Sequence, residues 1–502
     1  MRKLITQSKL NQAKSTLAKS DQAKSDQTKI GYFIKSLREQ RGLTQGDFAK
    51  ALSTSQSAVA RMEKGDQNMT LEQLAKISEV LDHKIVSISD SVDFKIEGGR
   101  KLSGSIRTNV SKNGAIGLIA AALINQSTTV LSGIPHIEEV HRMTEALQSI
   151  GVKLRWIGRN TLEINPPKKY SFKEIDDAAF RKIRVGLYLF GALGKQLDNF
   201  AIPHSGGCKM GKRTISAHEG ALTELGLKIK TTDTHYEVSH GKLHGADITM
   251  LEAGDTSAIN ALLLAAQIPE KTIIRFVPPN YQVQEVCFFL QKLGVQIDGV
   301  GTTTLTVKGK DSFNKKISYE NSEDPIESMM FISAAVVTRS KLVIKRCPID
   351  FLRLEMQKLK GMGQKFEVSK SYPAKNGFTQ LVDITVLPSK LKALSDKIHP
   401  LPYPGINSDN LPFFVPIATQ AEGTTLIHDW MWENRAIYFT ELNRLGANVH
   451  LADPHRAFIE GPTKLTGAQV VCPPALRPAM IILIAMLGAE GTSTLRNVYS
   501  IR

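Results

Sequence analysis

The glycine-rich segment IPHSGGCKMGKRTISAH, residues 202–218, has the strongest chemical potential in the chain. Two adjacent glycines give a flexible loop in which Cys208 can be exposed. Three cations follow that cysteine within five residues: Lys209, Lys212 and Arg213. Neighbouring positive charge lowers the pKa of a thiol and attracts phosphate. The segment therefore predicts a reactive thiolate beside a phosphate-bearing ligand.

The same segment also fits a second pattern. Gly206 through Lys212 match GxxxxGK of a nucleotide-binding P-loop, in which the next residue is a Ser or Thr that holds magnesium. Here that residue is Arg213, and no convincing acidic strand end offers the metal a ligand. ATP hydrolysis is therefore disfavoured.

Three other places carry residues that can bind an anion or move a proton. Lys112 and Asn113 stand where an apolar helix should begin, so an ammonium and the amides of a helix N-terminus can meet an anion. Arg184 lies near another helix start, 24 residues before Cys208. Asp409, in PYPGINSDNLPFF, lies at a loop-to-helix boundary, where a carboxylate is most often an N-cap. Taken alone, each residue also fits a solvated surface charge or a cap.

The balance of charge indicates an anionic partner. The chain has 64 basic and 48 acidic residues, a formal net charge of +16. Such an excess suits nucleic acid, a membrane surface or phosphorylated small molecules. Residues 1–93 hold 15 basic and 11 acidic residues, so twelve of the surplus charges lie in the rest of the chain. The later part of the chain is therefore expected to hold the anion.

Length and composition exclude several classes of protein. A chain of 502 residues with 42% hydrophobic residues can bury a large core, which excludes disorder of the whole chain. The longest apolar run, Ala479–Leu487, is too short for a bilayer, which needs roughly 20 residues, and the N-terminus turns polar too soon for a signal peptide. The four cysteines form no CxxC pair, which argues against a disulfide scaffold or a zinc ribbon. We therefore expect a cytoplasmic protein without membrane attachment.

The chain is expected to begin with a tail and a small helical domain. In residues 1–29 lysines recur every five residues, a period that fits neither helix nor strand, so this tail is expected to be disordered. The sequence predicts four short helices in residues 30–88 and a linker in residues 89–93. The expected caps are Thr44 with Asp47, Thr70 with Gln73, and Gly65.

The string LTQGDFAKALSTSQSAVARMEKG, residues 43–65, resembles the Xre/lambda-repressor-like family of helix-turn-helix DNA-binding domains. Short helices joined by tight turns allow one helix to enter a major groove. The resemblance implies that four residues face DNA: Gln45, Gln56, Ser57 and Arg61. The alternative is that the module serves protein interaction or dimerisation.

From residue 94 the chain repeats itself with a long period. Each unit has an Ala-rich apolar helix, a strand, a loop, and a second helix that ends in a Leu-Gly-type step into another strand. The glycines of this step are spaced 75, 68, 69 and 83 residues apart: Gly151, Gly226, Gly294, Gly363 and Gly446. Each unit leaves one sheet face uncovered, so the units must pack together.

Five and a half such units resemble the enolpyruvyl transferase family over residues 94–502. The resemblance implies an α/β fold of two inside-out α/β barrels, built from βαβαββ repeats. It places residues 94–111 and 323–502 in the first barrel, and residues 112–322, with the Cys208 loop, in the second. The sixth unit lacks its second helix and final strand, so we expect either a fragment or frameshift product, or a protein that works without that piece.

Within the family the resemblance is to the branch that acts on UDP-N-acetylglucosamine. It implies transfer of the enolpyruvyl group of phosphoenolpyruvate to the sugar 3′-hydroxyl with release of phosphate, the first committed step of peptidoglycan synthesis, with no metal or organic cofactor. Cys208 would protonate the enol carbon or add covalently, and Asp409 would take the hydroxyl proton. Six residues would bind the substrates: Lys112, Asn113, Arg184, Arg213, Met431 and Arg435.

The chain departs from the family pattern at three places. Ser205 replaces the usual Pro before the two glycines, TISAH at 214–218 replaces Pro-Val-Asp-Leu-His, and Pro325 replaces an arginine between Asp324 and Glu327. Two alternatives therefore stay open. One is a DNA-binding regulator with a degenerate transferase-like sensor domain, and the other is the shikimate-pathway enolpyruvyl transferase, to which the Gly-Gly-Cys loop is foreign.

Overall fold

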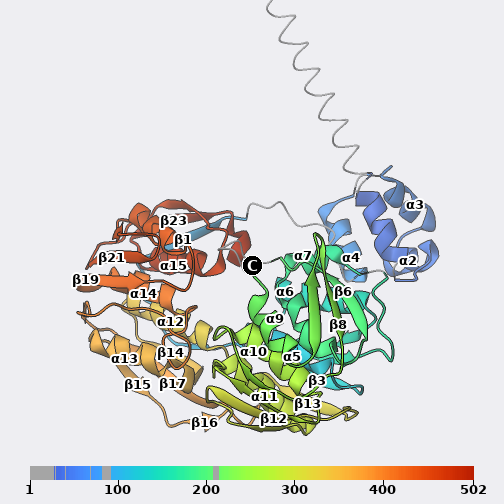
Figure 1. The fold of residues 1–502 in the computed structure, drawn as a ribbon. Coiled ribbons are helices and arrows are strands. Elements are labelled where there is room, and N and C mark those ends of the chain that lie inside the picture. Colours follow the sequence, from blue (N-terminus) through green and yellow to red (C-terminus); the bar gives the residue numbers. More distant parts are fainter. Residues whose placement is uncertain are drawn as a thin grey trace, which may run out of the picture. The chain divides into compact units, whose positions relative to one another are not determined.

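The computed structural model describes residues 28, 30–39, 41–67, 69–81, 92–173, 175–206 and 214–501. The chain divides into two compact units, Met1–Ser91 and Val92–Arg502 (Figure 1). Most of the expected tail lies outside the described residues. The same is true of Cys208 and Arg213. No helix in the described ranges is both long and apolar enough to cross a membrane.

The first unit is a bundle of short helices. It has a helix over residues 30–39, followed by α2 (Gln45–Ala51), α3 (Gln56–Lys64) and α4 (Leu71–Val80). The expected caps are confirmed. The side chains of Thr44 and Thr70 each form a capping box with the residue three positions later, and Gly65 ends α3 at φ 75°.

A buried ion pair ties three of these helices together. The Arg38 guanidinium donates to Glu63 at 2.5 and 3.1 Å, and the two side chains are 7% and 3% exposed. The amide of Gln45 donates to the same carboxylate at 2.9 Å. Glu63 is therefore occupied inside the unit rather than presented on the surface of α3.

The second unit has two hydrophobic cores, which define two lobes. The core of the middle lobe is built from residues between Ala115 and Tyr319, and that of the terminal lobe from residues between Ile326 and Val498 with Tyr281. The terminal lobe also takes two early strands, β1 (Phe94–Gly98) and β2 (Ser105–Arg107).

The middle lobe carries three small sheets around buried helices (Figure 1). Its sheets are β13-β3-β5-β4 (Ile317–Glu320, Thr129–Ser132, Thr161–Asn165, Lys153–Trp156), β6-β8-β7 (Asn199–Pro203, His235–His240, Leu227–Thr231) and β11-β12-β10-β9 (Gln296–Asp298, Thr304–Lys308, Lys271–Arg275, Asp247–Thr249). Its helices are α5 (Lys112–Ala122), α6 (Glu138–Ser149), α7 (Asp177–Lys182), η1 (Val185–Tyr188), α8 (Leu189–Leu193), α9 (Ser216–Thr223), α10 (Asp255–Ala265) and α11 (Tyr281–Leu293).

The terminal lobe repeats this plan. Its sheets are β1-β23-β22 (with Gly491–Arg496 and Gln469–Val471), β15-β17-β14-β2 (Lys365–Val368, Gln380–Leu387, Leu342–Pro348), with β16 (Tyr372–Pro373) beside β17, and β18-β19-β21-β20 (Leu391–Lys392, Ala421–His428, Arg456–Gly461, Asn448–Leu451). Its helices are α12 (Pro325–Val337), η2 (Ile349–Leu352), α13 (Arg353–Gly361), η3 (Leu411–Phe413), α14 (Phe414–Ala418), η4 (Ala436–Leu445), α15 (Leu476–Gly488) and η5 (Val498–Ile501).

The predicted repeat is confirmed in the backbone. All five glycines of the Leu-Gly step have a positive φ, between 86° and 98°, and each comes one or two residues before a strand. Only glycine adopts this left-handed conformation without strain, so it ends the helix and turns the chain into the sheet. Each lobe has separate sheets packed outside apolar helices, not one closed barrel.

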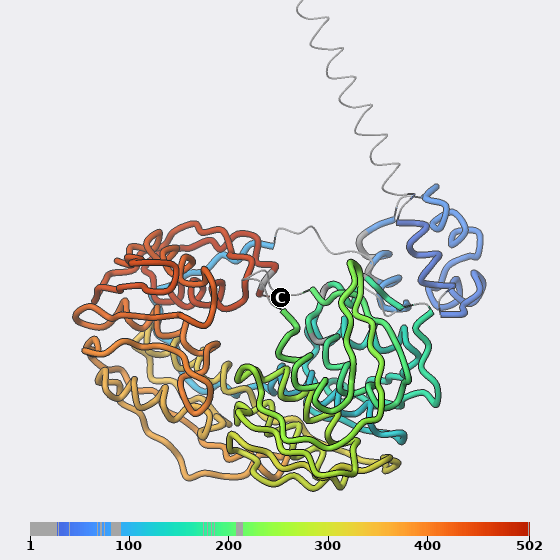
Figure 2. Tube along the Cα trace, in the orientation of Figure 1, coloured from blue at the N-terminus to red at the C-terminus, as the bar shows by residue number. Residues whose placement is uncertain are grey.

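Residues far apart in sequence complete the sixth sheet. β1 pairs antiparallel with β23, Phe94 opposite Leu495, while β22 pairs parallel with β23 (Figure 2). In the described chain this sheet holds three strands.

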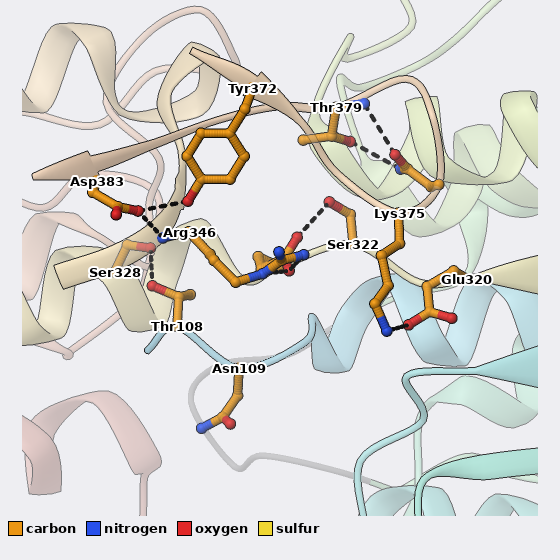
Figure 3. Close-up of polar contacts among 12 residues, drawn as sticks. Thr108, Asn109, Glu320, Ser322, Ser328, Arg346, Tyr372, Lys375, Thr379 and Asp383 are labelled. Atoms are coloured by element: carbon orange, nitrogen blue, oxygen red, sulfur yellow. Dashed lines mark hydrogen bonds and ion pairs between the residues drawn. The ribbon is translucent and has the colours of Figure 1, made fainter. Parts of the chain in front are cut away.

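Two crossing segments join the lobes (Figure 3). Residues 108–111 and 321–324 run beside each other, with Ser111 N donating to Ser322 O at 2.7 Å and Asp324 N to Asn109 O at 2.8 Å. Asn321 also donates to the carbonyls of Ser111 and Gly133. Around them, Arg346 pairs with Glu323 and Lys375 with Glu320. These contacts fix where the first residues of α5 and α12 lie.

Candidate active site

Each of the six repeat units has an ionisable residue where its buried helix begins. The spacing along the chain is 72, 71, 69, 85 and 68 residues: Lys112, Arg184, Asp255, Asp324, Asp409 and Arg477. The sequence singled out Lys112, Arg184 and Asp409 as site residues and noted Asp324, but it missed Asp255 and Arg477. The register of the repeat was the signal that would have found both.

Lys112 is the first residue of α5 and is already paired. Its Nζ lies 2.6 Å from Glu139 Oε2 of α6, and the two side chains are 34% and 31% exposed. The next residue, Asn113, donates from Nδ2 to the hydroxyl of Tyr281 at 2.9 Å. An anion that binds Lys112 must therefore share the ammonium with Glu139.

Asp409 lies on the other lobe, just before η3, and pairs with an arginine. Arg477 Nη2, in the first turn of α15, lies 3.3 Å from Asp409 Oδ2. Burial by itself raises the pKa of Asp409, but Arg477, Arg435 and Lys112 together hold it below its ordinary value. Asp409 is therefore an ionised carboxylate at neutral pH. It is not an N-cap, because Asn410 takes that position.

Arg435 supports the Asp409 loop from behind. It is fully buried and binds Asp429 at 2.5 and 2.7 Å, while Nη2 also donates to the carbonyl of Ser408 at 2.8 Å. Its Nη1 makes no hydrogen bond to any described residue. The predicted contact of Arg435 with substrate stays a prediction, since the side chain presents no surface in this form. Met431 is 38% exposed nearby in sequence.

Arg184 and the acidic residues of α12 occupy other parts of the site. Arg184 Nη2 donates to Thr214 O at 3.1 Å, which ties it to the segment after the Cys208 loop. Asp324 caps α12 with Pro325 at the first helical position, and Arg477 counters the rise in pKa that burial causes at Asp324. Glu327 accepts from both nitrogens of Asn109, so it holds the crossing segment.

Asp255 has the most unusual environment of the six. It begins α10 and accepts from Asn280 Nδ2 at 3.0 Å. Burial raises its pKa to about 7, Asn280 and Gln282 counter that rise, and the charge of Asp409 adds to it. Asp255 and Asp409 therefore form a pair of carboxyls from opposite lobes whose environments separate their pKa values.

The described cysteines do not supply a thiolate. Cys287, Cys347 and Cys472 are buried, and burial raises the pKa of Cys287 and Cys347 to about 12. Cys208 and Arg213 lie outside the described residues, so their roles stay predictions. Within the part of the chain that the structure describes, no group of three His, Cys, Asp or Glu side chains could hold a metal ion.

In the first unit, α3 has an outward face free of exposed carboxylate. Gln56, Ser57 and Arg61 are exposed on it, and the one acidic residue of α3, Glu63, is buried. Gln45 is half-buried and held by Glu63. The structure thus exposes three of the four predicted DNA-facing residues and gives the fourth a structural contact.

Comparison with known proteins decides the family. The model of the family described as EPSP synthase (3-phosphoshikimate 1-carboxyvinyltransferase) matches residues 96–502. The chain belongs to the enolpyruvyl transferase family. The UDP-N-acetylglucosamine 1-carboxyvinyltransferase of Bradyrhizobium diazoefficiens is 33% identical over 414 residues, which cover 81% of this chain and 92% of that protein. The Treponema denticola protein of the same name is 35% identical, over 82% of this chain and 94% of that one.

Solved structures of enolpyruvyl transferases share the fold. The enolpyruvyl transferase NikO from Streptomyces tendae matches with a TM-score of 0.70 at 22% identity, over 82% of this chain and 94% of that one. EPSP synthase from Acinetobacter baumannii matches with a TM-score of 0.65 at 19% identity. The predicted fold class is confirmed. A helix-turn-helix family model matches residues 34–85, which confirms the type of the first unit.

Proposed function

We propose that this enolpyruvyl transferase moves the enolpyruvyl group of phosphoenolpyruvate onto the 3′-hydroxyl of UDP-N-acetylglucosamine and releases phosphate. The observation that carries the proposal is the 33 and 35% identity to UDP-N-acetylglucosamine 1-carboxyvinyltransferases over more than nine-tenths of their length. The proposed setting is the cytoplasm, at the start of peptidoglycan synthesis.

The charges of the site suit this reaction. Both substrates are multiply anionic, and Lys112, Arg184 and Arg477 bring cations to the starts of three buried helices. Asp409 is ionised and can take the proton of the sugar hydroxyl as it attacks. Cys208, which lies outside the described residues, is proposed to protonate the enol carbon or add to the resulting cation.

Other side chains are proposed to bind and position the substrates. Arg213 would hold phosphate, and Asn113 and Met431 would contact the nucleotide sugar. Arg435 keeps Asp409 in place through Ser408. Among the described residues its Nη1 has no hydrogen-bond partner, so this nitrogen keeps its donors for an anion.

The test is phosphate release from phosphoenolpyruvate with purified full-length chain. We expect phosphate release that depends on UDP-N-acetylglucosamine. With shikimate 3-phosphate as the sole acceptor, we expect no release above the background without acceptor. Release with shikimate 3-phosphate instead would assign the chain to the other branch of the family. A folded protein that releases phosphate with neither acceptor would contradict the proposal and favour a regulator with a sensor domain.

A second function is favoured by the first unit. We infer that α3 binds duplex DNA, because its exposed face carries Gln56, Ser57, Arg61 and Lys64 while Glu63 is withdrawn into an ion pair with Arg38. Polar and cationic side chains on one short helix are what base edges and phosphates accept. Net positive charge without exposed carboxylate on this face avoids repulsion of the DNA backbone.

DNA binding can be measured by fluorescence anisotropy with genomic fragments at several salt concentrations. Arg61→Ala should weaken binding, and if Arg61 contacts phosphate the slope of log K against log salt should fall by about one. Gln45→Ala is the matched control, since Gln45 is held by Glu63 and should affect stability more than affinity. Binding that is equal in the wild type and Arg61→Ala would refute the assignment of α3.

A further inference from the structure

Asp255 occupies a place in the site that corresponds to functional charges in the other repeats. It begins α10 as Lys112 begins α5, and Arg477 lies in the first turn of α15. Its partner Asn280 caps α11, and the next residue, Tyr281, accepts from Asn113. Two hydrogen bonds, one from Asn280 to Asp255 and one from Asn113 to Tyr281, therefore link Asp255 to the Lys112-Asn113 pair.

The carboxyl of Asp255 is also coupled to both sides of the site. The charge of Asp255 and that of Glu139, the partner of Lys112, both raise the pKa of the buried Tyr188 hydroxyl. The charge of Asp409, on the other lobe, adds to the rise in the pKa of Asp255. Asp255 Oδ1 is buried and has no hydrogen-bond partner among the described residues. The groups that face Asp255 are Asn280, Gln282, Tyr281, Tyr188 and Asp409.

These surroundings favour a neutral carboxyl. Asn280 and Gln282 are uncharged, the tyrosines are buried and protonated, and Asp409 is negative. From α9, His218 forms a hydrogen bond with Asn260 of α10, and burial lowers the pKa of His218 to about 4, so it brings no positive charge at neutral pH. A protonated carboxyl can donate a hydrogen bond, and the Oδ1 atom of Asp255 has no partner among the described residues.

The proposed reaction needs such a donor. Overall, the proton of the sugar hydroxyl must end on phosphate, yet Asp409, which accepts it, lies on the terminal lobe. Lys112 and Arg184, two of the cations proposed to meet the anionic substrates, belong to the middle lobe, and so does Asp255. Resting on the proposed function, we propose that Asp255 is the general acid that protonates phosphate as it leaves the ketal intermediate.

The step balances. As the carbon–oxygen bond to phosphate breaks, its electron pair goes to the phosphate oxygen, which takes the proton of Asp255. The proton that Cys208 had added to the enol carbon returns to that thiolate, and the carbon–hydrogen electron pair forms the new double bond. Asp409 then passes the proton from the sugar hydroxyl to the Asp255 carboxylate, directly or through water. Both carboxyls and the thiol return to their starting states.

The test is rapid-quench analysis of Asp255→Asn with labelled phosphoenolpyruvate and UDP-N-acetylglucosamine. Addition should proceed while breakdown slows, so a phosphate-bearing adduct accumulates and kcat falls by about 10²–10³-fold. In the wild type kcat should fall as pH rises through neutrality, and the variant should lack that decline. Asp247→Asn is the matched control, because Asp247 of β9 is an exposed carboxylate paired with Arg275 of β10.

Two results would overturn the inference. One is turnover of Asp255→Asn within threefold of the wild type, and the other is a lower kcat with no adduct and an unchanged pH profile. Absence of phosphate release by the wild type is a different result, which refutes the proposed function and this inference with it. Tryptophan fluorescence and urea unfolding show whether each variant is folded.

Discussion

Replacing Asp255 by Asn should stabilise the second unit, and more so at high pH. Asn keeps an oxygen that can accept from Asn280, but it removes a carboxyl whose charge is costly at this position. The pKa of Asp255 rises from 3.8 to about 7 on folding. The wild type therefore loses stability as pH rises from about 4 to about 7, because the unfolded chain ionises first.

The size of the effect follows from that pKa difference. At about 1.4 kcal/mol per pKa unit, the loss in the wild type reaches a ceiling of about 4 kcal/mol above pH 7. Between pH 5 and pH 8 the gap in unfolding free energy between Asp255→Asn and the wild type should widen by about 2–3 kcal/mol.

Urea unfolding followed by tryptophan fluorescence measures this gap. The three tryptophans, Trp156, Trp430 and Trp432, all lie in the second unit, so the signal reports that unit alone. Asp247→Asn serves as the control, since Asp247 is exposed and its pKa is lowered by Arg275. A constant gap between pH 5 and pH 8 would refute a neutral Asp255 in the folded protein.

Three other substitutions test the site. Cys208→Ser should abolish turnover or slow it at least about 100-fold in the phosphate-release assay, and normal turnover would exclude a catalytic thiol. Arg477→Met removes a cation that lowers the pKa of Asp409, so the acid limb of kcat/KM should move to higher pH; an unmoved limb would show that Asp409 is not the base. Arg435→Met leaves Asp429 buried and unpaired, so the unfolding free energy should fall by about 3–5 kcal/mol in urea, whereas a change under 1 kcal/mol would contradict the buried pair.

Local features of the fold were predictable because they depend on neighbours in sequence. The capping boxes at Thr44 and Thr70 join residues three positions apart, and Gly65 ends α3 because a left-handed residue is needed there. The same rule explains the glycines of the Leu-Gly step, whose positive φ confirmed the repeat. From that repeat, with the residues around Cys208, the family could be recognised.

Contacts between one helix or loop and the next were not predictable in the same way. The resemblance implies that Arg435 binds substrate, but in the fold its side chain is fully buried against Asp429. Lys112 reads as a free ammonium, but Glu139 of the next helix lies 2.6 Å away. Each pairing depends on how helices and loops pack, which residue spacing does not encode.

The sequence by itself determined which residues begin the buried helices, because an apolar helix must start where its polar flank ends. Repetition of that start six times placed one charge per unit. Only the tertiary structure decided which of these charges act on one another: Arg477 on Asp409, and Asp409 on Asp255 across the lobes. Coulomb interactions depend on distance and burial, and both are set by packing two lobes about the crossing segments rather than by position along the chain.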